Sequence, residues 1–128
     1  GNVGHEVFAT ALAAAAADPD RHWRLLIGGT QAARDAQTMT RGAPPNVTIE
    51  PARPDFRALL RHAACSVSLC GYNTALDILQ AGCPAVFVPF DAGNEVEQTI
   101  RAKALTAQPG IEMLTTATLS ANALLASA

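Results

Sequence analysis

The sequence predicts an α/β fold in three layers, with a parallel sheet covered by helices on both faces. Short β-rich runs alternate strictly with helical stretches along the whole chain, which is the pattern of strands joined by crossover helices. Hydrophobic residues make up 49% of the 128 residues and charged residues 16%, so the chain can bury a core. Residues 1–128 are therefore interpreted as one domain.

The first half of the chain is expected to contain two helices and two strands. Residues 5–17 form a helix, because they are rich in alanine, the strongest helix former, and a D-P-D turn follows them. A strand is expected at residues 23–27 (W-R-L-L-I), which a G-G-T turn closes. A polar helix over residues 31–41 precedes glycine and two prolines, and a short strand follows at residues 47–50.

The middle of the chain repeats this alternation. Residues 54–64 are expected to be helical, since a phenylalanine and two leucines recur at helical spacing. A strand at residues 66–69 leads through C-G-Y-N into a helix at residues 74–81, which Gly82 and Pro84 end.

The last four elements complete the pattern. Residues 85–88 (A-V-F-V) form a continuous apolar strand of the kind expected when both faces of a sheet are covered. A helix is expected at residues 94–108, a strand at residues 111–114 and a last helix at residues 119–126.

The chain opens with Gly1-Asn2-Val3-Gly4 and then a helix. In α/β folds such a glycine turn follows a strand, but no strand precedes it here. The expectation is that the first strand of the sheet lies upstream of residue 1, so that the sheet lacks it.

Charge and composition exclude several classes of protein. A net charge of −2 argues against a nucleic-acid-binding protein, which needs a basic face. Three cysteines make no disulfide framework, and their spacing with the histidines matches no zinc site. Cys65 and Cys83 are expected to be buried. The longest apolar run is too short to cross a membrane.

Four turns offer glycine or small polar residues just before a helix, at residues 1–4, 28–30, 70–74 and 89–94. Helix N-termini suit phosphate, because their N–H groups and positive dipole end attract anions. The alternative for each turn is an ordinary connecting loop without a bound phosphate, because glycines are also common turn residues. Thr74 and Asp77, like Asn94 and Glu97, fit a capping box.

Three segments follow one another in order: S-L-C-G-Y-N-T-A-L-D, A-G-C-P-A-V-F-V-P-F and E-V-E-Q-T-I-R-A. They fit the patterns G-x-N-T-x-x-[DE], G-x-P-x-x-x-x-P and E-x-E-Q-x-x-R-A. With these motifs the chain resembles the carboxy-terminal domain of family 28 glycosyltransferases. The resemblance implies a GT-B enzyme with two Rossmann-like domains, of which this one binds a nucleotide-sugar donor, typically UDP-linked.

The resemblance also implies roles for individual residues. The donor diphosphate would lie on Gly71, Tyr72, Asn73 and Thr74, and the ribose on Asp77. Glu97 and Gln98 would contact the donor sugar. The cleft would be bordered by Gly28, Gly29, Thr30 and Phe56, and the loop at residues 51–56 would cover the base.

Two positions depart from the family pattern: Asp77 is one methylene shorter than the usual glutamate, and Cys70 stands where a histidine is common. Asp18-Pro19-Asp20 is interpreted as a turn and not as a metal motif. His5 is close to the first turn and is interpreted as a solvent-facing residue.

The implied enzyme inverts the anomeric centre and needs no metal and no cofactor. The catalytic base would belong to an amino-terminal acceptor domain, on the same chain or on a partner chain, and through it the enzyme would associate peripherally with the inner face of the membrane in the cytoplasm. The isolated domain would bind donor without transferring sugar. Alternatives are a donor-binding subunit of a two-chain transferase and an epimerase or hydrolase of nucleotide sugars. A nicotinamide-binding domain is disfavoured, because G-x-G-x-x-G spacing is lacking.

Overall fold

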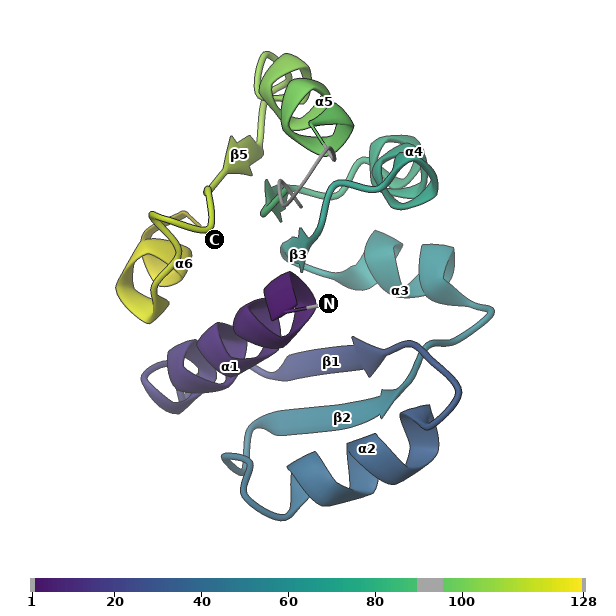
Figure 1. The fold of residues 1–128 in the computed structure, drawn as a ribbon, viewed down its shortest axis with the longest axis vertical. Helices are drawn as coiled ribbons and strands as arrows, with labels where there is room; N and C mark the ends of the chain where they lie inside the picture. The colour runs from purple at the N-terminus through teal and green to yellow at the C-terminus, as the bar shows by residue number, and fades with distance from the viewer. Residues whose placement is uncertain (1, 90–95, 128) are drawn as a thin grey trace.

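The computed structural model describes residues 2–89 and 96–127 (Figure 1). The helices are α1 (Asn2–Ala16), α2 (Ala32–Thr40), α3 (Phe56–His62), α4 (Tyr72–Ala81), α5 (Glu97–Leu105) and α6 (Ala121–Ser127). The strands are β1 (Trp23–Ile27), β2 (Val47–Pro51), β3 (Ser66–Ser68), β4 (Ala85–Phe87) and β5 (Ile111–Met113). Every element expected from the sequence is present in its expected order, which confirms the alternating α/β pattern.

The glycine turn expected at residues 1–4 is wrong for the residues described, because α1 already begins at Asn2. The alanine-rich run behind it explains the difference. Once a helix is nucleated, each further residue adds one hydrogen bond, so the helix extends back through Gly4.

All strand pairs are parallel, but the strands form two separate sheets. β1 pairs with β2, with Leu25 opposite Ile49, and β3, β4 and β5 form a second sheet in that order. Among the described residues no strand lies between β1 and β3. Among the described residues the sheet is therefore interrupted between β1 and β3, and the expected strand upstream of residue 1 stays a prediction.

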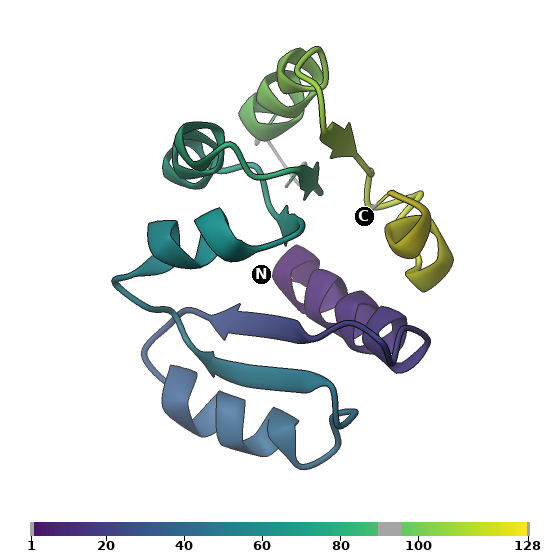
Figure 2. The same ribbon diagram turned by 180° about the vertical axis from the view of Figure 1, so that it is seen from behind.

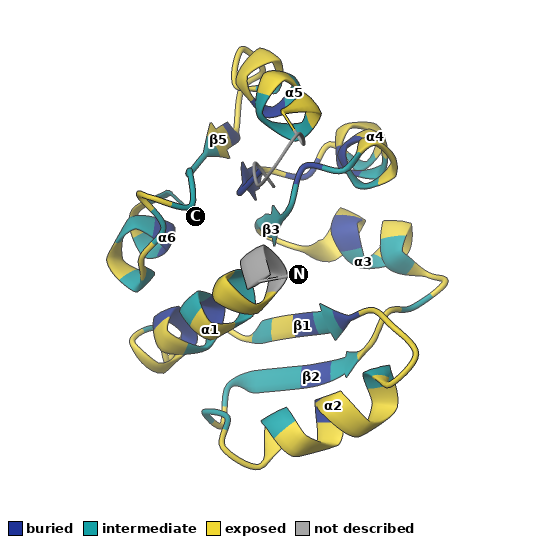
Figure 3. Ribbon diagram, viewed as in Figure 1, coloured by how far each residue is buried: buried dark blue, intermediate teal, exposed yellow. Residues whose placement is uncertain are grey.

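Two buried clusters cover the two faces of the strands, which gives the three layers that the sequence predicted (Figure 3). One cluster joins α1, α2 and α6 to the strands through residues such as Ala14, Leu25, Val86 and Leu124. The other joins α3, α4 and α5 through residues such as Leu60, Ile78, Phe87 and Ala102. Val86 and Phe87 are neighbours on β4 that point to opposite faces, and both are fully buried.

The turn between α1 and β1 lies at the opposite edge from the helix N-termini that follow the strands. Asp18 accepts hydrogen bonds there from Arg21 Nε (2.6 Å) and from Trp23 Nε1 (3.0 Å). Asp18 thus closes a turn, as expected. In both ribbon views the start of α1 lies between the β1–β2 pair and β3 (Figures 1 and 2).

Candidate functional site

The candidate site lies at the edge where the strands end. In an open parallel sheet the loops beyond the carboxyl ends of the strands gather at one edge, together with the N-termini of the helices that follow. Here those loops precede α2, α3 and α4. They contain the three sequence segments singled out above: residues 28–30, 51–56 and 70–74.

The turn between β3 and α4 is open on its outer side. Gly71 stands just before α4 with φ −67° and ψ 155°, and within residues 2–89 and 96–127 no side chain caps the helix. A Cβ atom added at Gly71 would meet no atom of the described residues within 4 Å. Because Gly71 has no side chain, a ligand can approach the N-terminus of α4 closely.

The capping-box interpretation of Thr74 and Asp77 is wrong, because α4 begins at Tyr72, two residues before Thr74. An N-cap residue must stand just outside the helix, whereas Thr74 lies within its first turn. Its hydroxyl is therefore not used as the N-cap of α4.

Two side chains of α5 hold the β3–α4 turn in place. The Cys70 N–H donates to Gln98 Oε1 (3.1 Å), and Arg101 Nη1 donates to the Cys70 carbonyl (2.7 Å). The Arg101 guanidinium also lies 5.7 Å from the centre of the Tyr72 ring, within the range of a cation–π contact. Gln98 and Arg101 are three residues apart and so share one face of the helix.

These contacts give Gln98 a part in shaping the site. The resemblance assigned it to the donor sugar, and that contact remains a prediction. Glu97 is exposed at the first residue of α5, and its sugar contact is likewise a prediction. Asn94 lies outside the described residues.

Asp77, the expected ribose ligand, is paired with an arginine that sequence reasoning missed. Arg57 Nε of α3 donates to Asp77 Oδ1 at 2.6 Å, with 58% of the Arg57 side chain and 23% of the Asp77 side chain exposed. The pair fixes one carboxylate oxygen and ties α3 to α4. No sequence pattern signals it, because the two residues are 20 positions apart on different helices.

A network of ion pairs orders the loop expected to cover the base. Arg53 contacts both oxygens of Asp55, at 2.8 and 2.7 Å, and it also reaches Glu50 at 3.2 Å. Arg24 of β1 donates to the same Glu50 oxygen at 2.6 Å.

The same network shifts the pKa values of its members. The hydrogen bond from Arg24, followed by that from Arg53, lowers the pKa of Glu50. The hydrogen bond from Arg53 lowers the pKa of Asp55. Both carboxylates stay charged near neutral pH, and the loop is held by charge-assisted bonds.

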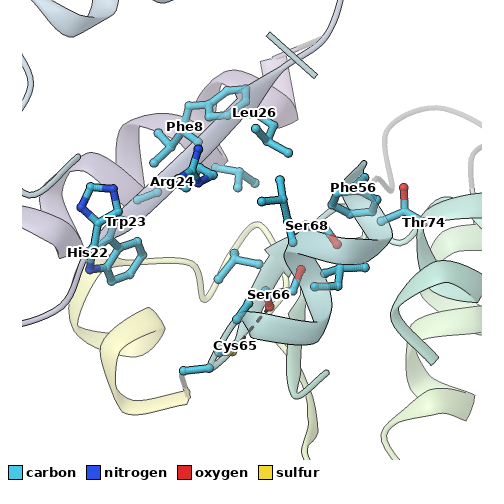
Figure 4. Close-up of a pocket in the computed structure, with 18 of the residues that line it drawn as sticks. Phe8, His22, Trp23, Arg24, Leu26, Phe56, Cys65, Ser66, Ser68 and Thr74 are labelled. Carbon is cyan, nitrogen blue, oxygen red and sulfur yellow. Dashed lines mark hydrogen bonds between the residues drawn. The ribbon is translucent and has the colours of Figure 1, made fainter. Parts of the chain in front are cut away.

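The residues expected to border the donor cleft lie at different places along the edge where the strands end. Phe56 and Thr74 line one groove, which also runs between β1 and β3 (Figure 4). Gly28, Gly29 and Thr30 are exposed between β1 and α2, with Gly29 at φ +103°. The structure thus brings Phe56 and Thr74 together and keeps the glycine turn outside that groove.

The cysteines and histidines add no reactive centre. Burial raises the pKa of the Cys65, Cys70 and Cys83 thiols, which therefore stay protonated near neutral pH. Cys83 is buried as expected, whereas Cys65 is half-buried and Cys70 is fully buried. His5 is exposed, as expected.

Within residues 2–89 and 96–127, no group of three or more His, Cys, Asp or Glu side chains could hold a metal ion. No helix in that part of the chain is long and apolar enough to cross a membrane.

Comparisons with known proteins agree with this fold. The family described as "Glycosyltransferase family 28 C-terminal domain" matches residues 8–127. A UDP-N-acetylglucosamine–N-acetylmuramyl-(pentapeptide) pyrophosphoryl-undecaprenol N-acetylglucosamine transferase of Brucella anthropi is 32% identical over 127 residues, which cover 94% of this chain and 33% of that protein.

Two solved structures are similar. The glycotransferase of kitacinnamycin superposes with a TM-score of 0.75 at 26% identity, covering 94% of this chain and 29% of that one. The MurG protein of Acinetobacter baumannii superposes with a TM-score of 0.62 at 25% identity, covering 80% of this chain and 30% of that one. The chain thus spans about a third of the length of these relatives.

Proposed function

The chain belongs to the family of glycosyltransferase family 28 C-terminal domains, and from this premise we propose that it binds the nucleotide-sugar donor of an inverting, metal-independent glycosyltransferase. The donor is UDP-linked. The name of the Brucella relative includes a UDP-sugar, which supports this donor class. The acceptor site and the catalytic base belong to an amino-terminal domain of the same polypeptide.

One observation carries the proposal: the open β3–α4 turn stands within two helical turns of a fixed carboxylate. The diphosphate lies against the N-terminus of α4, where Gly71 leaves room for it. Asp77 lies in the next turn of the same helix, and its second carboxylate oxygen accepts hydrogen bonds from the ribose hydroxyls. Arg57 holds the first oxygen.

This placement explains how the domain assists transfer. An acceptor hydroxyl attacks the anomeric carbon, and the bond to the donor diphosphate breaks as negative charge grows on it. The positive end of the α4 dipole stabilises that charge. The two-domain enzyme positions acceptor and donor for the attack.

The acceptor decides where in the cell the full enzyme would act. The name of the Brucella relative includes an undecaprenol-linked acceptor, which is a lipid. We place the full enzyme at the inner face of the cytoplasmic membrane, held there by its amino-terminal domain.

The site is tested by calorimetric titration of the protein with UDP and UDP-N-acetylglucosamine. Asp77→Ala and Thr74→Ala are expected to weaken nucleotide binding about tenfold, the effect of about 1.4 kcal/mol of lost hydrogen bonding. Asp20→Ala is the matched control, because Asp20 is exposed at the opposite edge. Unchanged affinity in the first two variants would refute the site.

Transfer is separated from the alternatives by its products. A transferase releases free sugar from UDP-sugars only slowly in the absence of acceptor, whereas a hydrolase releases it at the full rate. An epimerase converts one UDP-sugar into another without releasing UDP.

A further inference from the structure

An exposed aromatic ring stands at the start of α4. Tyr72 is the first residue of this helix, and with 67% of its surface accessible it is the most exposed large hydrophobic side chain among the described residues. The side chains of a helix tilt toward its N-terminus, so the ring lies beside the open end of α4. Tyr72 belongs to neither of the two buried clusters, and its ring is accessible to a ligand.

A contact with α5 holds this ring in place. The Arg101 guanidinium lies 5.7 Å from the centre of the ring, within the range of a cation–π contact. The guanidinium is itself fixed, because its Nη1 donates to the Cys70 carbonyl at 2.7 Å. Tyr72 is therefore braced by Arg101 while most of its surface stays accessible. A braced ring loses less conformational freedom when a ligand packs on it.

The ring lies on one side of α4, and the expected ribose ligand lies on the other. Successive residues of a helix are about 100° apart around its axis, so Tyr72 and Asp77 are about 140° apart. The contacts agree, since Asp77 pairs with Arg57 of α3, whereas Tyr72 contacts Arg101 of α5. In both ribbon views α4 stands between these two neighbouring helices (Figures 1 and 2). Tyr72 thus marks the α5 side of the site, and Asp77 marks the α3 side.

The covalent structure of a nucleotide sugar relates these two sides. Its ribose and its hexose are attached to opposite ends of the diphosphate. If the diphosphate lies on the N-terminus of α4 and the ribose on Asp77, the hexose extends toward α5, where the ring of Tyr72 lies. We propose that the Tyr72 ring is the surface on which the hexose of the donor packs, an inference that rests on the proposed function.

The chemistry of the ring suits a sugar. A pyranose carries C–H groups on its faces and hydroxyl groups around its rim. The face of an aromatic ring carries partial negative charge and attracts C–H groups. The sugar therefore packs a C–H face on Tyr72 and keeps its hydroxyls for polar groups. The backbone N–H of Tyr72 is a separate group and stays available to the diphosphate.

Calorimetric titration of the full polypeptide with UDP and with UDP-N-acetylglucosamine tests this contact through the ratio of the two affinities. Tyr72→Ala should lower the affinity for UDP-N-acetylglucosamine about three- to tenfold more than the affinity for UDP, as expected for the loss of one aromatic contact. Tyr72→Phe keeps the ring and should keep the ratio.

Leu79→Ala is the matched control. Leu79 is an exposed apolar residue of the same helix. It lies seven residues after Tyr72, and so on the same face but about 10 Å farther along the axis. Its replacement should leave the ratio of the two affinities as it is in the unaltered protein.

The outcomes separate this inference from the proposed function. An unchanged ratio in Tyr72→Ala, together with weaker binding of both ligands by Asp77→Ala, would overturn the ring contact and leave the proposed function in place. Unchanged affinities for both ligands in Asp77→Ala and Thr74→Ala would overturn the two together. A ratio that falls equally in Tyr72→Phe would assign the effect to the hydroxyl, and one that falls equally in Leu79→Ala would assign it to α4 as a whole. Either result would overturn the ring contact.

Discussion

At the scale of single residues, Arg57 is the feature that separates this site from its sequence pattern. It holds one oxygen of Asp77 at 2.6 Å, which orients the carboxylate. Arg57→Ala is expected to weaken UDP binding by up to about fivefold, because exposed ion pairs contribute about 0.2–1 kcal/mol. Arg57→Lys should restore part of the affinity.

Calorimetry checks this prediction, with Arg61→Ala as the control, since Arg61 is exposed on the same helix. If the Arg57→Ala variant and the unaltered protein bind UDP with equal affinity, Arg57 does not orient Asp77 for binding.

The loop network makes a second residue-scale prediction, on pH. The folded-state pKa values of Glu50 and Asp55 are lowered by their arginine partners. Their contribution to stability is therefore complete above the unfolded pKa values, near pH 4 to 5, and is lost as pH falls through the lowered folded values. Arg53→Ala should reduce the part of the stability that disappears on acidification.

Urea unfolding at pH 7 and pH 3 measures the effect as a difference in the free energy of unfolding. Arg41→Ala serves as the control, because Arg41 is exposed at the end of α2. A loss on acidification that is the same with and without Arg53 would contradict the role of the network.

At the scale of elements, α5 acts as the support of the β3–α4 turn through Gln98 and Arg101. Arg101→Ala removes a charge-assisted bond to the Cys70 carbonyl and the contact with Tyr72. We expect it to lower the stability by about 1–2 kcal/mol and to weaken nucleotide binding as well. Thermal unfolding and calorimetry measure the two effects.

Lys103→Ala on the same helix is the matched control, since Lys103 is exposed. An Arg101→Ala variant with lower stability and unchanged nucleotide affinity would show that the turn takes no part in binding.

The end of α4 carries another element-scale prediction. Gly82 has φ +68° and its N–H closes the helix on the Ile78 and Leu79 carbonyls. Gly82→Ala should cost about 1–2 kcal/mol, because the left-handed region is unfavourable for residues with a Cβ atom. The melting temperature measures it, with Gly42→Ala, which has no positive φ, as the control. A smaller loss at Gly82 than at Gly42 would be inconsistent with this cap.

The elements show why the sequence predicted the fold well and the site only partly. The order of strands and helices depends on local patterns, such as the A-V-F-V run that contains β4. These patterns were sufficient to predict the order of the elements. The start of α4 was placed two residues late, because Thr74 and Asp77 imitate a cap. The Arg57–Asp77 pair and the hold of Gln98 on Cys70 depend on tertiary packing, which no local pattern encodes.

At the scale of the whole molecule, the interruption between β1 and β3 is the feature that most sets this chain apart from a complete doubly wound sheet. One buried cluster spans this interruption, because Leu25 and Ile27 of β1 share it with Val86 of β4. The site stands at the carboxyl edge beside this groove, with Phe56 and Thr74 on its rim.

The central claim is that the nucleotide lies on the N-terminus of α4, and a crystal structure of the protein with UDP bound tests it most directly. The diphosphate should lie within hydrogen-bonding distance of the backbone N–H groups of residues 72–74, with the ribose hydroxyls donating to Asp77. A diphosphate bound at Gly28–Thr30 and the start of α2, with Asp77 touching only Arg57, would contradict the claim.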